Sequence, residues 1–284
     1  MKLINQFLKY LFYELNYSKN TVKNYQYDLK EFYDYFKIIP EEYSSIREYL
    51  MELYKKNYQK KSIARKISSL RSFYKYLFSE NKIKNNPMIL ISNPKLDKKL
   101  PKYLNYEELE KVLLIPDDTT LIGARDALIL EMLYSTGIRV SELVNIKLSD
   151  INFEEFKIKI LGKGNKERIV YYVDICFKKL KNYLKLRKST NEYLFLNKHG
   201  NQLSDRLVRQ IVDEVGKKAN LKMKISPHVF RHTFATHMLN EGADLKSVQE
   251  LLGHENISTT SIYTHVSNEH LRNVYLNCHP RAKK

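Results

Sequence analysis

A basic, breaker-rich stretch at residues 85–101 divides the chain into two regions of different character. It contains two Asn-Pro pairs, Asn86-Pro87 and Asn93-Pro94. Such pairs favour turns, and a helix seldom continues through the residue before a proline. Because domain boundaries fall in segments of this kind, the sequence predicts a first domain at 1–84, a linker at 85–101 and a second domain at 102–284.

Apolar residues in the first region recur at helical spacing, which predicts four amphipathic helices. The first lies at the N-terminus, where interrupting polar residues and the lack of a small-residue cleavage site argue against a signal peptide. The second begins after Ser18, a suitable N-cap, and ends at Pro40. The third and fourth cover Tyr43–Tyr54 and Ser62–Phe78.

The second region mixes helix and strand patterns. Helical spacing covers Tyr106–Leu114, Gly123–Tyr134, Ser141–Ile146 and much of the chain from Ser204 onward, including a tail helix at Asn268–Asn277. Two alternating segments, Phe156–Leu161 and Arg168–Val173, predict strands joined by a hairpin turn at Gly162–Asn165. The predicted fold class is therefore mainly α, with a four-helix first domain and an α+β second domain that holds a small antiparallel sheet.

Charge indicates the kind of partner. The chain carries 49 Lys+Arg against 32 Asp+Glu, a formal net charge of +17 at pH 7. From Lys55 to Lys84 every charged side chain except Glu80 is basic, and tyrosines are interleaved among them. This pattern predicts a polyanionic partner, and nucleic acid fits better than an anionic membrane surface. A general Lys- and Asn-rich composition is the alternative explanation.

Two further features indicate the compartment. No apolar run approaches the roughly 18–20 residues that a membrane-spanning helix needs. The only two cysteines, Cys176 and Cys278, lie far apart in the sequence, so neither a disulfide framework nor a zinc ribbon is expected. These features predict a cytoplasmic protein without a membrane partner.

The segment Ser226–His237 combines the features of an anion site. Pro227 suits the first turn of a helix, and His228 and Arg231 share one helical face near that N-terminus. The free N–H groups and the helix dipole favour a phosphate there. Alternatively, His228 and His232 are core histidines or two zinc ligands, although Arg231 between them would repel a metal ion.

Other motifs accompany this segment. They are Thr-Gly-x-Arg-x-Ser-Glu-Leu around Arg139, Gly-Lys-Gly-x-Lys around Lys163, Leu-Leu-Gly-His ending at His254, and Tyr-Thr-His beginning at Tyr263. Together with His228-x-x-Arg231 they resemble the tyrosine recombinase (phage-integrase-type) family, and the likeness covers the whole chain. The compact length and the C-terminal sequence are most similar to the Xer branch. The resemblance implies a SAM-like core-binding domain followed by a catalytic domain.

The resemblance also implies the reaction. Tyr263 would attack a DNA phosphodiester and form a covalent 3′-phosphotyrosyl intermediate. Arg139 and Arg231 suit the nonbridging oxygens, because each planar guanidinium can offer two hydrogen bonds. A free phenol has a pKa of about 10, so the nucleophile needs a base, for which His228 is the candidate.

The remaining predicted site residues have supporting roles. Lys163 is the candidate acid that protonates the departing 5′ oxygen, and His254 is expected to donate a hydrogen bond to the phosphate. Glu142 is expected to orient Arg139 or a histidine. No metal and no cofactor are expected, because one phosphodiester is exchanged for another and the chain lacks a phosphate-loop motif.

The partners follow from the same resemblance. They are double-stranded DNA with a specific recombination site and three further copies of the chain, which form a homotetramer on two DNA sites, or a second recombinase as hetero-partner. Three basic residues of the first region are candidates to face a DNA groove: Lys60, Arg65 and Arg71. The tail helix either docks into a neighbouring subunit or packs on its own domain.

Several functions remain open at this point. An Xer-like enzyme would resolve chromosome dimers, which links it to chromosome partition and cell division. A mobile-element integrase or resolvase has the same layout, and a type IB topoisomerase has the same tyrosine chemistry without synapsis. A noncatalytic DNA-binding regulator is disfavoured, because such a protein has no need of Tyr263 or Lys163.

Overall fold

A computed structural model describes residues 1–95, 102–162, 167–253 and 267–282. The chain forms two compact units, Met1–Lys99 and Leu100–Lys284, each with its own hydrophobic core. The predicted fold class is confirmed, since the structure is mainly helical with one small antiparallel sheet in the second unit.

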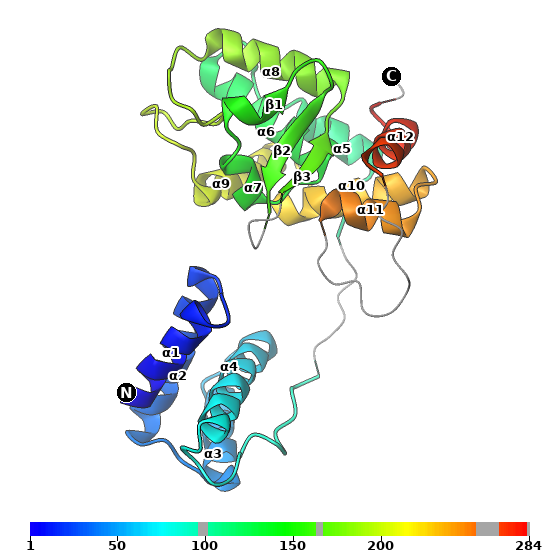
Figure 1. Ribbon diagram of the computed structural model, residues 1–284. Coiled ribbons are helices and arrows are strands. Elements are labelled where there is room, and N and C mark those ends of the chain that lie inside the picture. The colour runs from blue at the N-terminus through cyan, green and yellow to red at the C-terminus, as the bar shows by residue number, and fades with distance from the viewer. Residues whose placement is uncertain (96–101, 163–166, 254–266, 283–284) are drawn as a thin grey trace. The chain divides into compact units, whose positions relative to one another are not determined.

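Four helices build the described part of the first unit (Figure 1). They are α1 (Lys2–Tyr13), α2 (Lys19–Phe36), α3 (Tyr43–Lys55) and α4 (Lys60–Ser79). As predicted, Ser18 caps α2, and its side chain accepts a hydrogen bond from the Thr21 N–H at 3.2 Å. One apolar stripe from each helix faces the core, in which Phe7, Phe32 and Phe73 are fully buried.

The second helix ends earlier than the sequence predicts. It stops at Phe36 rather than at Pro40, because Lys37 adopts the left-handed conformation with φ of 61° and its N–H bonds to the Tyr33 carbonyl at 2.7 Å. A residue in this conformation ends many helices. Pro40 lies beyond the helix, and its carbonyl accepts a hydrogen bond from the buried Tyr74 hydroxyl at 2.6 Å.

Part of the predicted linker packs on the first unit. Met88 and Ile91 are buried in its core. Arg71 on α4 donates to the Ile91 carbonyl at 2.7 Å. The chain from Asn85 to Ile91 therefore belongs structurally to the first unit.

The second unit combines helices with a three-stranded sheet, and the helices lie behind and beside the sheet (Figure 1). Its elements are α5 (Tyr106–Leu113), α6 (Leu121–Thr136), α7 (Val140–Val144), the 3₁₀ helix η1 (Leu148–Asp150), β1 (Ile151–Asn152), β2 (Lys157–Leu161), β3 (Glu167–Tyr171), α8 (Asp174–Leu186), α9 (Asp205–Lys218), α10 (Pro227–Asn240), α11 (Leu245–Leu252) and α12 (Asn268–Cys278). The strands are antiparallel in the order β1-β2-β3, and Leu161 pairs with Glu167 at the end of the predicted hairpin. The hairpin residues 163–166 lie outside the described part of the chain.

Helix α6 is the centre of this unit. It packs against α8 and α10 and is apolar on nearly every side, as expected for a helix surrounded by others. The sequence predicts α6 but not α8, whose apolar and lysine residues alternate without a clear breaker before it.

The tail helix α12 packs on its own unit. Tyr275 is buried, and its hydroxyl donates to the Ser135 carbonyl of α6 at 3.0 Å. The ring of Tyr275 stacks on buried His279 with centroids 5.0 Å apart. Of the two arrangements that the sequence leaves open, this structure has the tail on its own domain.

Within the described ranges, no helix is long and apolar enough to cross a membrane.

The end of α6 offers a test of the packing. Gly137 has φ of +60°, and a Cβ there would lie 2.7 Å from carbon atoms of both Leu252 and Phe234. We expect Gly137→Ala to lower the free energy of unfolding by about 1–2 kcal/mol for the left-handed backbone and by a further ~1–3 kcal/mol for overpacking. Urea denaturation of the purified protein measures the loss.

Gly200→Ala is the matched control. Gly200 also has a left-handed φ, +77°, but a Cβ there would meet nothing within 4 Å. Only the backbone contribution, about 1–2 kcal/mol, is expected for this variant. Equal losses for the two alanine variants would contradict the close contact of α6 with Leu252 and Phe234.

Candidate active site

Arg139 lies where the chain leaves α6 and enters α7. Its backbone N–H donates to Glu142 Oε2 at 2.8 Å, and its Nη1 donates to Glu142 Oε1 at 2.9 Å. Its Nη2 donates to the Gly253 carbonyl at the end of α11, also at 2.9 Å. The guanidinium is thus held from two sides, by a carboxylate and by a helix end.

Glu142 binds a second arginine. Nη1 and Nη2 of Arg168, on β3, donate to the two carboxylate oxygens, each at 2.8 Å. The Glu142 side chain is only 4% exposed. Burial alone would raise the pKa of this carboxyl, but the hydrogen bonds and charge of Arg168 and Arg139 outweigh burial and hold the pKa below its usual value.

Arg231, on α10, binds two backbone carbonyls. Its Nη1 donates to Gly137 and its Nη2 to Leu252, both at 2.7 Å. Burial, together with the positive charge of nearby Arg139, lowers the pKa of this guanidinium to about 10. Arg231 therefore stays charged at neutral pH, in surroundings that favour an additional anion.

Two helix ends converge on these arginines. Gly137 ends α6 and Gly253 ends α11, both in the left-handed conformation. Carbonyl groups at a helix C-terminus carry partial negative charge, which complements a guanidinium. The described contacts use two of the five N–H donors of Arg139 and two of those of Arg231. Both arginines keep donor capacity for a phosphate.

The other predicted catalytic residues are placed in part. His228 is exposed on the first turn of α10, one turn before Arg231. Lys163, His254 and Tyr263 lie outside the described residues. The structure therefore brings together Arg139, Glu142 and Arg231 on described contacts.

The candidate groove-facing residues have different surroundings. Lys60 is exposed at the start of α4. Arg65 forms an ion pair with buried Asp28. Arg71 donates to the Ile91 carbonyl and to Asn93. Intramolecular contacts thus already orient Arg65 and Arg71.

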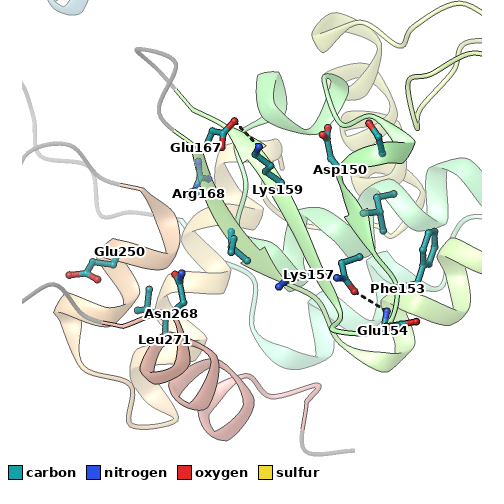
Figure 2. A pocket seen from close by; sticks show the side chains of 14 residues that line it. Asp150, Phe153, Glu154, Lys157, Lys159, Glu167, Arg168, Glu250, Asn268 and Leu271 are labelled. Atoms are coloured by element: carbon teal, nitrogen blue, oxygen red, sulfur yellow. Dashed lines mark hydrogen bonds and ion pairs between the residues drawn. The ribbon is translucent and has the colours of Figure 1, made fainter.

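A pocket of about 840 Å³ lies beside the sheet, and Figure 2 shows the side chains that line it. Acidic Asp150, Glu154, Glu167 and Glu250 line it together with Lys157, Lys159 and Arg168. Among the described residues, neither Arg139 nor Arg231 lines this pocket. Its mixed charge suits a DNA backbone poorly, so the arginine pair is the better candidate for phosphate chemistry.

Comparison with known proteins identifies the family. Residues 102–270 match the phage integrase family, and residues 4–81 match the phage integrase N-terminal SAM-like domain. The first match alone covers more than half of the chain. This chain belongs to the phage integrase family.

Individual relatives agree with this assignment. The tyrosine recombinase XerC of Anoxybacillus flavithermus is 46% identical, with 98% of each chain covered. The structure of the XerH site-specific recombinase bound to difH substrate, a pre-cleavage complex, matches with a TM-score of 0.71 at 26% identity and covers 96% of this chain and 94% of that one. A lambda integrase tetramer bound to a Holliday junction shares the fold, with a TM-score of 0.72 at 18% identity and 90% and 74% coverage.

These findings confirm the predicted family and enzyme class. The chain is a tyrosine site-specific recombinase, and it is similar to Xer proteins. The XerH and lambda integrase structures that share its fold are bound to difH substrate and to a Holliday junction.

Sequence reasoning did not single out Arg168, whose Nη atoms bind Glu142. A signal was present, because Arg168 and Val170 stand two apart on a predicted strand and so share one face of the sheet. Val170 is buried, and Arg168 pairs across the sheet with buried Ile160. An arginine on an inward face needs a buried partner, which the sequence could not identify as Glu142.

The lowered pKa of Glu142 makes a prediction about pH. Glu142→Gln removes the charge, and wild type should be more stable by about 1–3 kcal/mol at pH 7. Because the folded pKa lies below the unfolded value of about 4.3, this advantage is complete above that pH and disappears as the pH falls through the folded pKa. Urea denaturation between pH 7 and pH 3 measures the difference.

Glu167→Gln is the control for this measurement. Glu167 pairs with Lys159 at 2.8 Å, and both side chains are 56% exposed. Such an exposed pair contributes about 0–1 kcal/mol. A stability difference between wild type and Glu142→Gln that does not change with pH would contradict the stabilising role of the ionised carboxylate.

Proposed function

We propose that this recombinase cuts and rejoins DNA through a 3′-phosphotyrosyl bond to Tyr263, in Xer-type resolution of chromosome dimers. One observation carries the proposal. The guanidinium groups of Arg139 and Arg231 converge on the end of α11, directly before the segment that contains His254 and Tyr263. Tyr263 follows in the sequence ten residues after Gly253, whose carbonyl binds Arg139.

In this scheme the arginines act on the phosphate. Arg139 and Arg231 stabilise the charge that develops on the nonbridging oxygens as Tyr263 attacks phosphorus. Glu142 keeps Arg139 in position. A comparable donor to a developing oxyanion typically contributes about 10²–10³-fold in rate.

Proton transfer completes the scheme. His228 accepts the proton of the Tyr263 hydroxyl, Lys163 gives a proton to the departing 5′ oxygen, and His254 donates a hydrogen bond to the phosphate. The new bond is a phosphodiester of similar energy to the old one. The reaction therefore needs no ATP and is reversible, and in this scheme Arg139 and Arg231 supply the positive charge that a metal ion could otherwise provide.

The assembly is part of the proposal. Four copies of the chain hold two DNA sites, or two copies share the tetramer with a second recombinase. The lambda integrase tetramer, which has the same fold, supports this arrangement. We place the protein in the cytoplasm, where its two cysteines remain free thiols.

Covalent trapping tests the proposal. The protein is incubated with fragmented genomic DNA in EDTA and without ATP, then denatured in SDS, and the protein-linked fragments are sequenced. We expect adducts at one short, partly palindromic site, because a phosphotyrosine bond survives denaturation. Tyr263→Phe, which lacks the nucleophilic oxygen, should give none.

The other outcomes discriminate between the remaining functions. Adducts scattered over the DNA would indicate a topoisomerase. Adducts that persist in Tyr263→Phe would exclude Tyr263 as the nucleophile. The chain is tested alone and together with a candidate partner recombinase. Tight DNA binding without any adduct in both tests would contradict the catalytic proposal.

A further inference from the structure

We infer that Arg168 is a positioning residue for DNA cleavage, which acts through Glu142 to fix the guanidinium of Arg139. This inference rests on the proposed function, in which Arg139 stabilises the scissile phosphate. It assigns a role to a residue on β3 that the family motifs around Arg139, Arg231 and Tyr263 do not include.

The contact between Arg168 and Glu142 is specific. Two parallel hydrogen bonds of 2.8 Å join the Nη atoms of Arg168 to the two carboxylate oxygens. A fork of this kind fixes the plane of the carboxylate as well as its distance. Lysine cannot reproduce it, because an ammonium group offers a single point of contact.

Glu142 transmits this orientation to Arg139. The same two oxygens accept hydrogen bonds from the backbone N–H of Arg139 at 2.8 Å and from its Nη1 at 2.9 Å. Loss of Arg168 would free the carboxylate to rotate, and the Arg139 guanidinium would rotate with it. A displacement of about 1 Å in a catalytic group can reduce the rate of reaction by about 10²-fold.

Arg168 is poorly placed to bind DNA itself. Its side chain is only 15% exposed, and its Nε is buried. Both of its Nη atoms bond to Glu142. The side chain also lies against Gly253, where an added Cβ would approach Arg168 Cδ and Nε to 3.0 Å. Arg168 therefore connects β3, α7 and the end of α11 with both Nη atoms bonded to Glu142, although part of its side chain lines the mixed-charge pocket of Figure 2.

The neighbouring pair Lys159–Glu167 provides a matched control. Figure 2 shows this pair on β2 and β3, and its ion pair measures 2.8 Å. Lys159→Met removes one positive charge from the sheet, as Arg168→Met does. Of Arg168 and Lys159, Arg168 is the one that contacts Glu142. Both variants lose one positive charge, so a slower cleavage seen in Arg168→Met alone cannot come from weaker electrostatic attraction to DNA.

The test is single-turnover cleavage of a nicked duplex that carries the site recovered by covalent trapping. For Arg168→Met we expect the rate of phosphotyrosyl formation at saturating DNA to fall by about 10–100-fold, the range typical of residues that orient a catalytic ligand. The dissociation constant for the duplex should change by less than about threefold, since phosphate contacts dominate affinity. Lys159→Met should leave the cleavage rate unchanged.

Two further measurements separate positioning from a structural role. Arg168→Met combined with Glu142→Gln should be no slower than the slower single variant, because both changes release the same guanidinium. The stability advantage of wild type over Arg168→Met in urea should shrink as the pH falls from 7 to 3, since in this variant Glu142 loses the group that most lowers its pKa. Additive losses, or a stability difference that does not change with pH, would overturn the inference.

Arg168→Lys is a second test of the inference, to be used if Arg168→Met does not fold. This variant keeps the positive charge beside Glu142, and it should still cleave more slowly than wild type because the fork is lost. Wild-type rates in both Arg168 variants would overturn the inference and leave the proposed function intact. A wild-type protein that forms no adduct would overturn both.

Discussion

The carboxylate of Glu142 is the constraint on which the rest of the site depends. It lies between the guanidinium groups of Arg139 and Arg168, and it accepts two hydrogen bonds from each residue. Without this negative charge two partly buried cations would repel each other where the dielectric constant is lower than in water. A carboxylate that is almost fully buried is itself unfavourable unless it is paired and hydrogen-bonded. Each partner therefore stabilises the other, and the start of α7 is fixed against β3.

The end of α11 is also part of this network. The carbonyls of Leu252 and Gly253 accept hydrogen bonds from Arg231 and Arg139, and the segment that contains Tyr263 begins one residue later. Any free energy that links the arginines to this helix end acts in both directions. An anion that reorients the guanidiniums must change the stability of the α11 terminus, and a shift of that terminus must change affinity for the anion. Anion binding at the arginine pair and the stability of the end of α11 are thus energetically coupled through backbone carbonyls.

Helix positions were predictable wherever apolar spacing and end signals agreed. The cap at Ser18 is an example, because a serine side chain can satisfy a free N–H of the first turn without any tertiary contact. The end of α2 was not predictable, since Lys37 adopts a left-handed conformation that few residues other than glycine and asparagine signal in advance. Helix α8 was missed for a related reason, because its lysines obscure the stripe that buries Leu180 and Tyr183 against α6.

The site shows a sharper division between what sequence can and cannot predict. Arg139 and Arg231 are recognisable because their neighbours form motifs, and a motif is a local property of the chain. The role of Arg168 depends on Glu142, 26 residues away in sequence, and on a strand pairing that fixes β3 where the Arg168 side chain reaches α7. The same holds for Arg65, whose partner Asp28 is visible only after α2 and α4 pack together. The sequence shows that a residue is positively charged. Whether that charge is free to bind DNA or instead orients another residue depends on a partner that only the folded structure identifies.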